Sequence, residues 1–106
     1  MLHDTFAALG DATRFAIVEK LLAEGELPAG KLQEVGTLSP PAISRHLKVL
    51  REAGIIEQRV DKQHRMYSVR PQAVRSIGRW AMSYQEFWTK SLDRLEAALM
   101  KEDHGT

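Results

Sequence analysis

The sequence predicts a mainly α-helical fold with one small β-hairpin, in a single domain that spans residues 1–106. Apolar residues recur at intervals of three and four before residue 54 and after residue 71, which is typical of amphipathic helices. Between Gly54 and Pro71 the period changes, which indicates two strands. No repeat, low-complexity tract or long linker interrupts the chain, whose length suits one domain.

The composition excludes several classes of protein. Hydrophobic residues make up 43% and charged residues 27% of the chain, a mixture typical of a soluble globular protein. The absence of cysteine excludes disulfides, thiolate metal sites and thiol redox sensing. No apolar run approaches the ~20 residues that span a bilayer, and residues 1–4 do not begin a signal peptide. The expected compartment is therefore the cytoplasm, without a membrane partner.

Two helices are predicted before residue 25. A short first helix is expected within residues 1–10, where the apolar residues at helical spacing are Leu2, Phe6 and Leu9. Asp11 can cap a second helix over residues 12–24, and Gly25 can end it. The expected apolar stripe of this helix is Phe15, Val18, Leu21 and Leu22.

A short third helix, at about residues 29–35, fits between Pro28 and Gly36. The fourth helix has a stronger signal, because Ser39 can cap it and Pro40 suits the first helical position, where no N–H is needed. It is expected to run to Ala53 and to stop at Gly54, and residues 39–54 form the predicted recognition helix.

The fourth helix is predicted to have one apolar and one polar face. At 100° per residue, its buried face should be Ile43, Leu47 and Leu50. The opposite side should carry Pro40, Pro41, Ser44, Arg45, Lys48 and Arg51. One face can therefore pack while the other presents hydroxyls and cations.

A β-hairpin, the predicted wing, is expected over residues 55–70. Its strands should be residues 55–60 and 65–69, with a polar tip at residues 61–64, and Pro71 should end it. The wing is basic, like the recognition helix. Residues 39–70 carry a net charge of +4, whereas residues 1–38 carry −3 and residues 71–106 carry 0. This distribution suggests that one surface faces a polyanion.

Helical periodicity resumes over about residues 72–102. The apolar stripe of this segment is Ile77, Ala81, Tyr84, Trp88, Leu92, Leu95 and Leu99. A helix of this length would extend about 45 Å, too far for so small a core to cover, so a partner subunit is expected to cover it. Gly78 and Ser83 are the predicted places for a bend or break, and the pattern leaves open whether there is one helix or two.

Two short helices followed by a capped, cationic helix make a helix-turn-helix, and the basic hairpin after it makes the arrangement winged. The major groove of B-DNA, about 12 Å wide, admits one α-helix, whose first turns meet the edges of the bases. The hairpin can then reach the flanking backbone or the minor groove. The sequence therefore predicts a winged helix-turn-helix that binds double-stranded DNA.

Three segments resemble one known family. They are LGDATR at residues 9–14, SPPAISRHLKVLREAGII at residues 39–56 and RMY at residues 65–67. Together they resemble the arsenical-resistance-repressor (ArsR) family of bacterial winged-helix repressors. Residues 80–88 and 92–95 resemble a branch of that family with an extended last helix. The resemblance implies a homodimer that pairs through residues 1–10 and 71–102, binds a palindromic operator, and is released by a ligand.

The resemblance also implies site residues. Contacts from the recognition helix would come from Ser39, Pro41, Ser44, Arg45, His46, Lys48 and Arg51. Contacts from the wing would come from Arg59, Lys62, Gln63 and Arg65. The dimer interface would include Leu2, Phe6, Ile77, Trp80, Tyr84, Trp88, Leu92, Leu95 and Leu99. Arg45 suits a guanine edge, whereas Lys48 and Arg51 suit phosphates.

No metal or other cofactor is expected. The cysteine pair of the family's usual third-helix metal site is missing from residues 31–36, and the last helix holds no histidine before His104. The aromatic residues Trp80, Tyr84, Phe87 and Trp88 have two interpretations. They are either dimer core or the lining of a pocket for an unknown small-molecule effector, because aromatic rings bind planar apolar ligands.

The sequence does not predict an enzyme. Ser44 and His46 are two positions apart on one helix and do not face each other. A glycine-rich phosphate loop, a GxSxG motif and an HExxH motif are all missing. The alternative to a DNA-binding regulator is a winged-helix protein-interaction module, in which the aromatic C-terminal helix binds a heterologous partner.

Overall fold

The computed structural model describes the backbone of residues 2–104 and the side chains of residues 2–101. The chain forms two compact units, the first ending at Ser76 and the second beginning at Ile77. None of the described helices is both long enough and apolar enough to cross a membrane.

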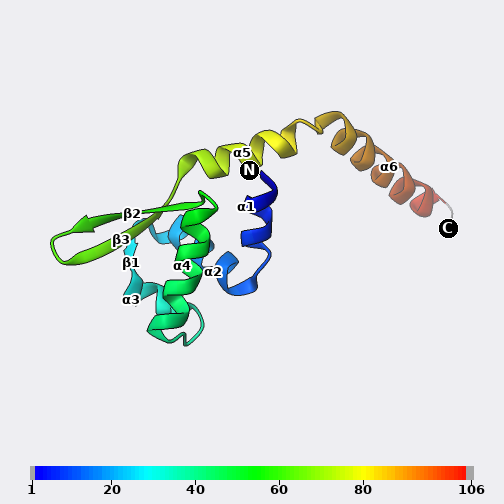
Figure 1. Ribbon diagram of the computed structural model, residues 1–106. Helices are drawn as coiled ribbons and strands as arrows, with labels where there is room; N and C mark the ends of the chain where they lie inside the picture. Colours follow the sequence, from blue (N-terminus) through cyan, green and yellow to red (C-terminus); the bar gives the residue numbers. More distant parts are fainter. Residues whose placement is uncertain (1, 105–106) are drawn as a thin grey trace. The chain divides into compact units, whose positions relative to one another are not determined.

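The first unit is a small helical body with one sheet (Figure 1). Its helices are α1 (Leu2–Leu9), α2 (Ala12–Glu24), α3 (Ala29–Leu32), a 3₁₀ turn (Gln33–Val35) and α4 (Pro40–Glu52). Its strands are β1 (Leu27–Pro28), β2 (Ile56–Asp61) and β3 (His64–Val69). Figure 1 shows α4 among the other helices and the β2–β3 hairpin extending beyond them. The mainly helical fold and the winged helix-turn-helix order are confirmed.

Local signals set the bounds of α2, but its predicted apolar face is partly wrong. Asp11 accepts a hydrogen bond from the backbone N–H of Arg14 at 3.0 Å, and Gly25 ends the helix with a φ of 85°. The core contains Ile17, Val18 and Leu21. Two residues of the predicted stripe, Phe15 and Leu22, are instead 48% and 57% exposed, because the buried arc is shifted toward Ile17.

Helix α4 confirms its predicted start and its predicted buried face. The hydroxyl of Ser39 accepts a hydrogen bond from the backbone N–H of Ala42 at 3.3 Å. Ile43, Leu47 and Leu50 are at most 2% exposed and pack in the core with residues of α2, the sheet and the segment before β2. The side of the helix that carries Ser44, Arg45 and Lys48 is left exposed.

The wing belongs to a sheet of three antiparallel strands in the order β1-β3-β2. The two-residue strand β1 was not predicted, because a pair of residues containing Pro28 has no periodicity to detect. The hairpin turn is also tighter than predicted. Asp61 and His64 pair as strand residues, so only Lys62 and Gln63 form the turn. Lys62 adopts a φ of 59° there.

The segment after the wing, for which the sequence left one or two helices open, forms two helices. They are α5 (Pro71–Met82) and α6 (Gln85–His104). The break contains Ser83, one of the two predicted places, whereas Gly78 lies inside α5. The hydroxyl of Ser83 donates to the carbonyl oxygen of Trp80 at 2.7 Å. Such a local bond competes with the helical ladder and accompanies the end of α5.

Candidate nucleic-acid interface

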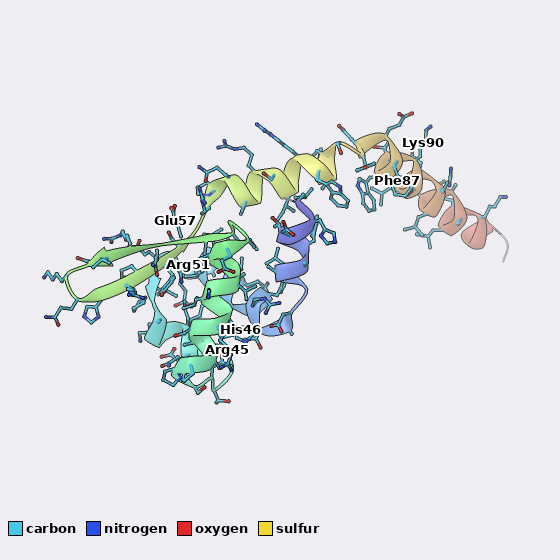
Figure 2. The ribbon with its side chains drawn as sticks, viewed as in Figure 1. Arg45, His46, Arg51, Glu57, Phe87 and Lys90 are labelled. Atoms are coloured by element: carbon cyan, nitrogen blue, oxygen red, sulfur yellow. The ribbon has the colours of Figure 1, made fainter. Side chains whose placement is uncertain are left out.

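The N-terminal half of α4 presents an exposed polar and cationic surface. Ser39, Pro41, Ser44, Arg45 and Lys48 are all exposed. Figure 2 shows Arg45 on the first turns of α4. The Ser39 cap and Pro40 fix where the helix starts, and the apolar face on the core sets its rotation. Arg45 therefore projects from a rigid helix, which suits the recognition of bases.

His46 lies at the edge of the buried face of α4 and is only partly exposed. Its Nδ1 is 3.4 Å from a guanidinium nitrogen of Arg14 in α2. Because arginine offers only donors, Nδ1 is the acceptor of this bond. His46 is thus held by protein, so its role as a DNA contact stays a prediction.

The prediction that Arg51 lies on the outer face of α4 is wrong. Arg51 is only partly exposed, and its buried Nε has no hydrogen-bond partner among the described residues. The reason is its spacing, because it follows the buried Leu47 by four residues and therefore borders the same stripe. Figure 2 shows Arg51 toward the C-terminal end of α4, away from Arg45.

All four predicted wing contacts are exposed, and three of them lie together at or next to the hairpin turn. Lys62 and Gln63 form the turn, and Arg65 lies next to it in β3. Among the described residues, Arg45, Lys62 and Arg65 form no ion pair, so their charges are available to a polyanion. Lys48 is only loosely paired, at 3.9 Å from Glu52.

Arg59 differs from the other wing residues, because its guanidinium is bound to Glu26. Its Nε lies 2.8 Å and 3.0 Å from the two carboxylate oxygens, and Nη2 contacts the same group. These bonds lower the pKa of Glu26 and raise the pKa of Arg59, since each ion stabilises the other. No pattern in the sequence indicates this pair, whose members are 33 residues apart.

The predicted dimer residues form mostly exposed apolar surface. Phe6, Trp80, Tyr84, Trp88, Leu92, Leu95 and Leu99 are 40–64% exposed, whereas Leu2 and Ile77 are partly buried. Within the second unit, the rings of Trp80 and Tyr84 meet edge to face at 5.7 Å. The rings of Phe87 and Trp88 do so at 5.2 Å. In the described part of the chain, no three His, Asp or Glu residues are grouped as a metal site needs.

Comparisons with known proteins agree with this arrangement. The sequence profile described as "Bacterial regulatory protein, arsR family" matches residues 11–58. The HTH-type transcriptional regulator Rv2034 of Mycobacterium tuberculosis is 39% identical over 85 residues, which cover 80% of this chain and 76% of that protein. Transcriptional repressor SdpR of Bacillus subtilis is 30% identical over 83 residues, which cover 78% of this chain and 91% of that protein.

A comparison with a solved structure shows that the fold is similar as well. The crystal structure of a "Possible transcriptional regulator for arsenical resistance" superposes with a TM-score of 0.66 at 34% identity. The match covers 89% of this chain and 94% of the other. The likeness therefore extends well beyond the segment that the family profile matches.

Proposed function

This chain belongs to the arsR family of bacterial regulatory proteins and is a DNA-binding transcriptional regulator, and we propose that it acts as a homodimeric repressor at a palindromic operator. Its named relatives regulate transcription, which favours DNA over a heterologous protein as the partner of the winged unit. Because the related SdpR is a repressor, repression is the preferred mode of action.

The observation that carries the proposal is the exposed N-terminal half of α4. Arg45 is the base-reading residue, since a guanidinium can donate two hydrogen bonds to the major-groove edge of guanine. Lys48 and the wing residues Lys62 and Arg65 bind phosphates, and Ser39 and Ser44 add hydroxyl contacts to phosphate or base. Pro41 offers an apolar contact to a thymine methyl group.

The dimer follows from the uncovered apolar surface. In α6, Trp88, Leu92, Leu95 and Leu99 follow one another at spacings of four, three and four, which is the pattern of a helix–helix seam. They are 49–64% exposed in a single chain. Exposed apolar surface of this extent marks an interaction site. A second copy supplies the matching helices, and two recognition helices then read two half-sites of a palindrome.

The aromatic residues of the second unit have a place in this proposal. Trp80, Tyr84, Phe87 and Trp88 contribute to the dimer core, and the same group is the first place to look for a small-molecule effector. We place the regulator in the cytoplasm, because a bacterial chromosome lies there.

The test is a fluorescence-anisotropy titration with DNA from upstream of the protein's own gene and with a scrambled duplex. Two subunits that make 8–10 phosphate contacts should lose on the order of 10³–10⁵ in affinity between 50 and 200 mM salt. The upstream duplex should bind more tightly than the scrambled duplex at every salt concentration. Equal binding of both duplexes at moderate salt contradicts sequence-specific repression.

A further inference from the structure

Arg14 is fixed at the corner where α1 ends and α2 begins. Its backbone N–H is bound by Asp11, and its Nε donates to the carbonyl oxygen of Ala8 at 2.7 Å. The side chain is only 19% exposed, and Asp11 Oδ2 lies 4.0 Å from Nη1. The guanidinium therefore donates one short hydrogen bond and lies beside a carboxylate, so Arg14 is held more firmly than an exposed surface cation.

The same guanidinium reaches the recognition helix. Its Nη1 lies 3.4 Å from Nδ1 of His46, and because arginine has only donors, Nδ1 is the acceptor. Figure 2 shows Arg45 and His46 as neighbours on α4. The buried residues Ile43, Leu47 and Leu50 set which face of the helix lies on the core, but their apolar contacts are not directional. A directional bond at the edge of that stripe limits rotation of α4 and so fixes where Arg45 points.

We propose that Arg14 and His46 are a positioning pair for operator binding, in which Arg14 orients α4 through His46 and neither side chain contacts DNA. This inference rests on the proposed function, and it removes His46 from the DNA contacts that the family resemblance assigns to it. Two observations support it: both residues are only partly exposed, and Nδ1 of His46 is already bound by Arg14.

The first experiment measures operator affinity over a range of salt concentrations for His46→Ala, His46→Gln and the matched control Lys48→Ala. His46→Ala should bind about tenfold more weakly, since without the bond to Arg14 the binding orientation of α4 is populated less often. Its plot of log K against log salt should keep the slope of the unaltered protein. His46→Gln should recover most of the affinity, because its amide oxygen can accept from Arg14. Lys48→Ala should instead flatten the slope by about 1 for each phosphate that the lysine no longer binds.

Two results would overturn the proposal. One is a slope for His46→Ala as flat as that of Lys48→Ala, which would make His46 a phosphate contact. The other is unchanged affinity in His46→Ala, which would remove its role altogether. A double-mutant cycle of Arg14→Lys with His46→Ala adds a check, because the effects of paired residues on affinity must be non-additive.

The second experiment needs no DNA, so it separates this inference from the proposed function. Amide hydrogen exchange of residues 42–47 should be faster in His46→Ala than in the unaltered protein or in Lys48→Ala. If the unaltered protein binds no operator but exchange still accelerates, the repressor proposal fails and the pairing of Arg14 with His46 stands. If exchange is the same in all three proteins, the positioning role is wrong.

Discussion

Arg45 is an exposed cation in the N-terminal half of α4. It lies two residues before the buried Leu47, on a different side of the helix. Replacement by alanine should cost about 1–3 kcal/mol of binding free energy and relax specificity at one base pair in each half-site. Lys62→Ala is the matched comparison in the wing. It should weaken binding to all sequences alike, because phosphate contacts carry no base information. Affinities for a set of single-base operator variants give both results, and the reverse pattern would exchange the two roles.

The pair of Glu26 and Arg59 makes a pH-dependent contribution to stability. The pKa of Glu26 is lowered from its ordinary value of 4.5, first by the hydrogen bonds from Arg59. A carboxylate with a lowered pKa in the folded state stabilises that state above its ordinary pKa. The stabilisation is lost as pH falls through the lowered value.

Glu26→Gln should therefore have a lower melting temperature than the unaltered protein at pH 7. The difference should shrink as pH falls below 4.5. Thermal unfolding of both proteins across this range checks the expectation. Glu34→Gln is the control, since it removes a longer, exposed pair with Lys31 at 3.8 Å. A difference in melting temperature that persists at the lowest pH would mean that the ion pair does not cause it.

Variants of the wing turn allow effects on folding stability to be measured separately from effects on DNA affinity. Lys62 adopts a φ of 59°, a conformation that costs a residue with a Cβ about 1–2 kcal/mol. Lys62→Gly should relieve this strain and raise the free energy of unfolding by up to about 1 kcal/mol. Lys62→Ala keeps the strain and should bring no such gain.

Both replacements at Lys62 remove the same charge, so both should lower DNA affinity equally. Denaturant unfolding and anisotropy titrations of the two variants measure these effects separately. Equal stability of Lys62→Gly and Lys62→Ala would show that the turn is not strained. A smaller decrease of affinity in only one variant would show that turn geometry, and not charge alone, contributes to binding.

Helix α2 shows what an element's own sequence can predict. Its bounds and its cap follow from Asp11 and Gly25, which act within a few residues of the helix ends. Its buried face was predicted less well, because Phe15 and Leu22 are exposed and Ile17 is buried. Helical spacing gives the period of the apolar residues, but the packing of α4 and β3 against α2 decides which arc is covered.

At the scale of the whole molecule, the apolar seam of α6 predicts that the protein is a dimer. Leu95→Asp places a charge in that seam on both copies. It should raise the dissociation constant of the dimer by at least about 100-fold, because two apolar side chains are no longer buried and two charges would be desolvated. Sedimentation velocity measures the change in mass. Operator affinity should fall with it, since a monomer reaches one half-site.

Asp93→Lys is the control for Leu95→Asp, because two residues of helix place Asp93 about 200° from Leu95 on the polar side. It changes charge without entering the seam, so the dimer should remain. A dimer of unchanged mass in Leu95→Asp would place the interface elsewhere. A monomeric unaltered protein would instead favour a heterologous partner for the aromatic helix.

The sequence predicts how charge is distributed along the chain. It does not predict which cations are paired, buried or exposed. Residues 39–70 carry a net charge of +4. Within this block the structure binds Arg59 to Glu26 and partly buries Arg51. Arg45, Lys62 and Arg65 are exposed and form no ion pair among the described residues. Which cations reach a ligand depends on acceptors that lie far away along the chain.

The sequence by itself determined the order and limits of most elements and the family, because caps, helix stops, turn residues and apolar periodicity act over three or four residues. Only the tertiary structure decided that β1 completes the sheet, that Phe15 and Leu22 face outward, and that Arg14 holds His46. Arg14 and His46 are 32 residues apart and Arg59 and Glu26 are 33 apart. Such contacts form only when packing brings separate elements together, so no local spacing encodes them.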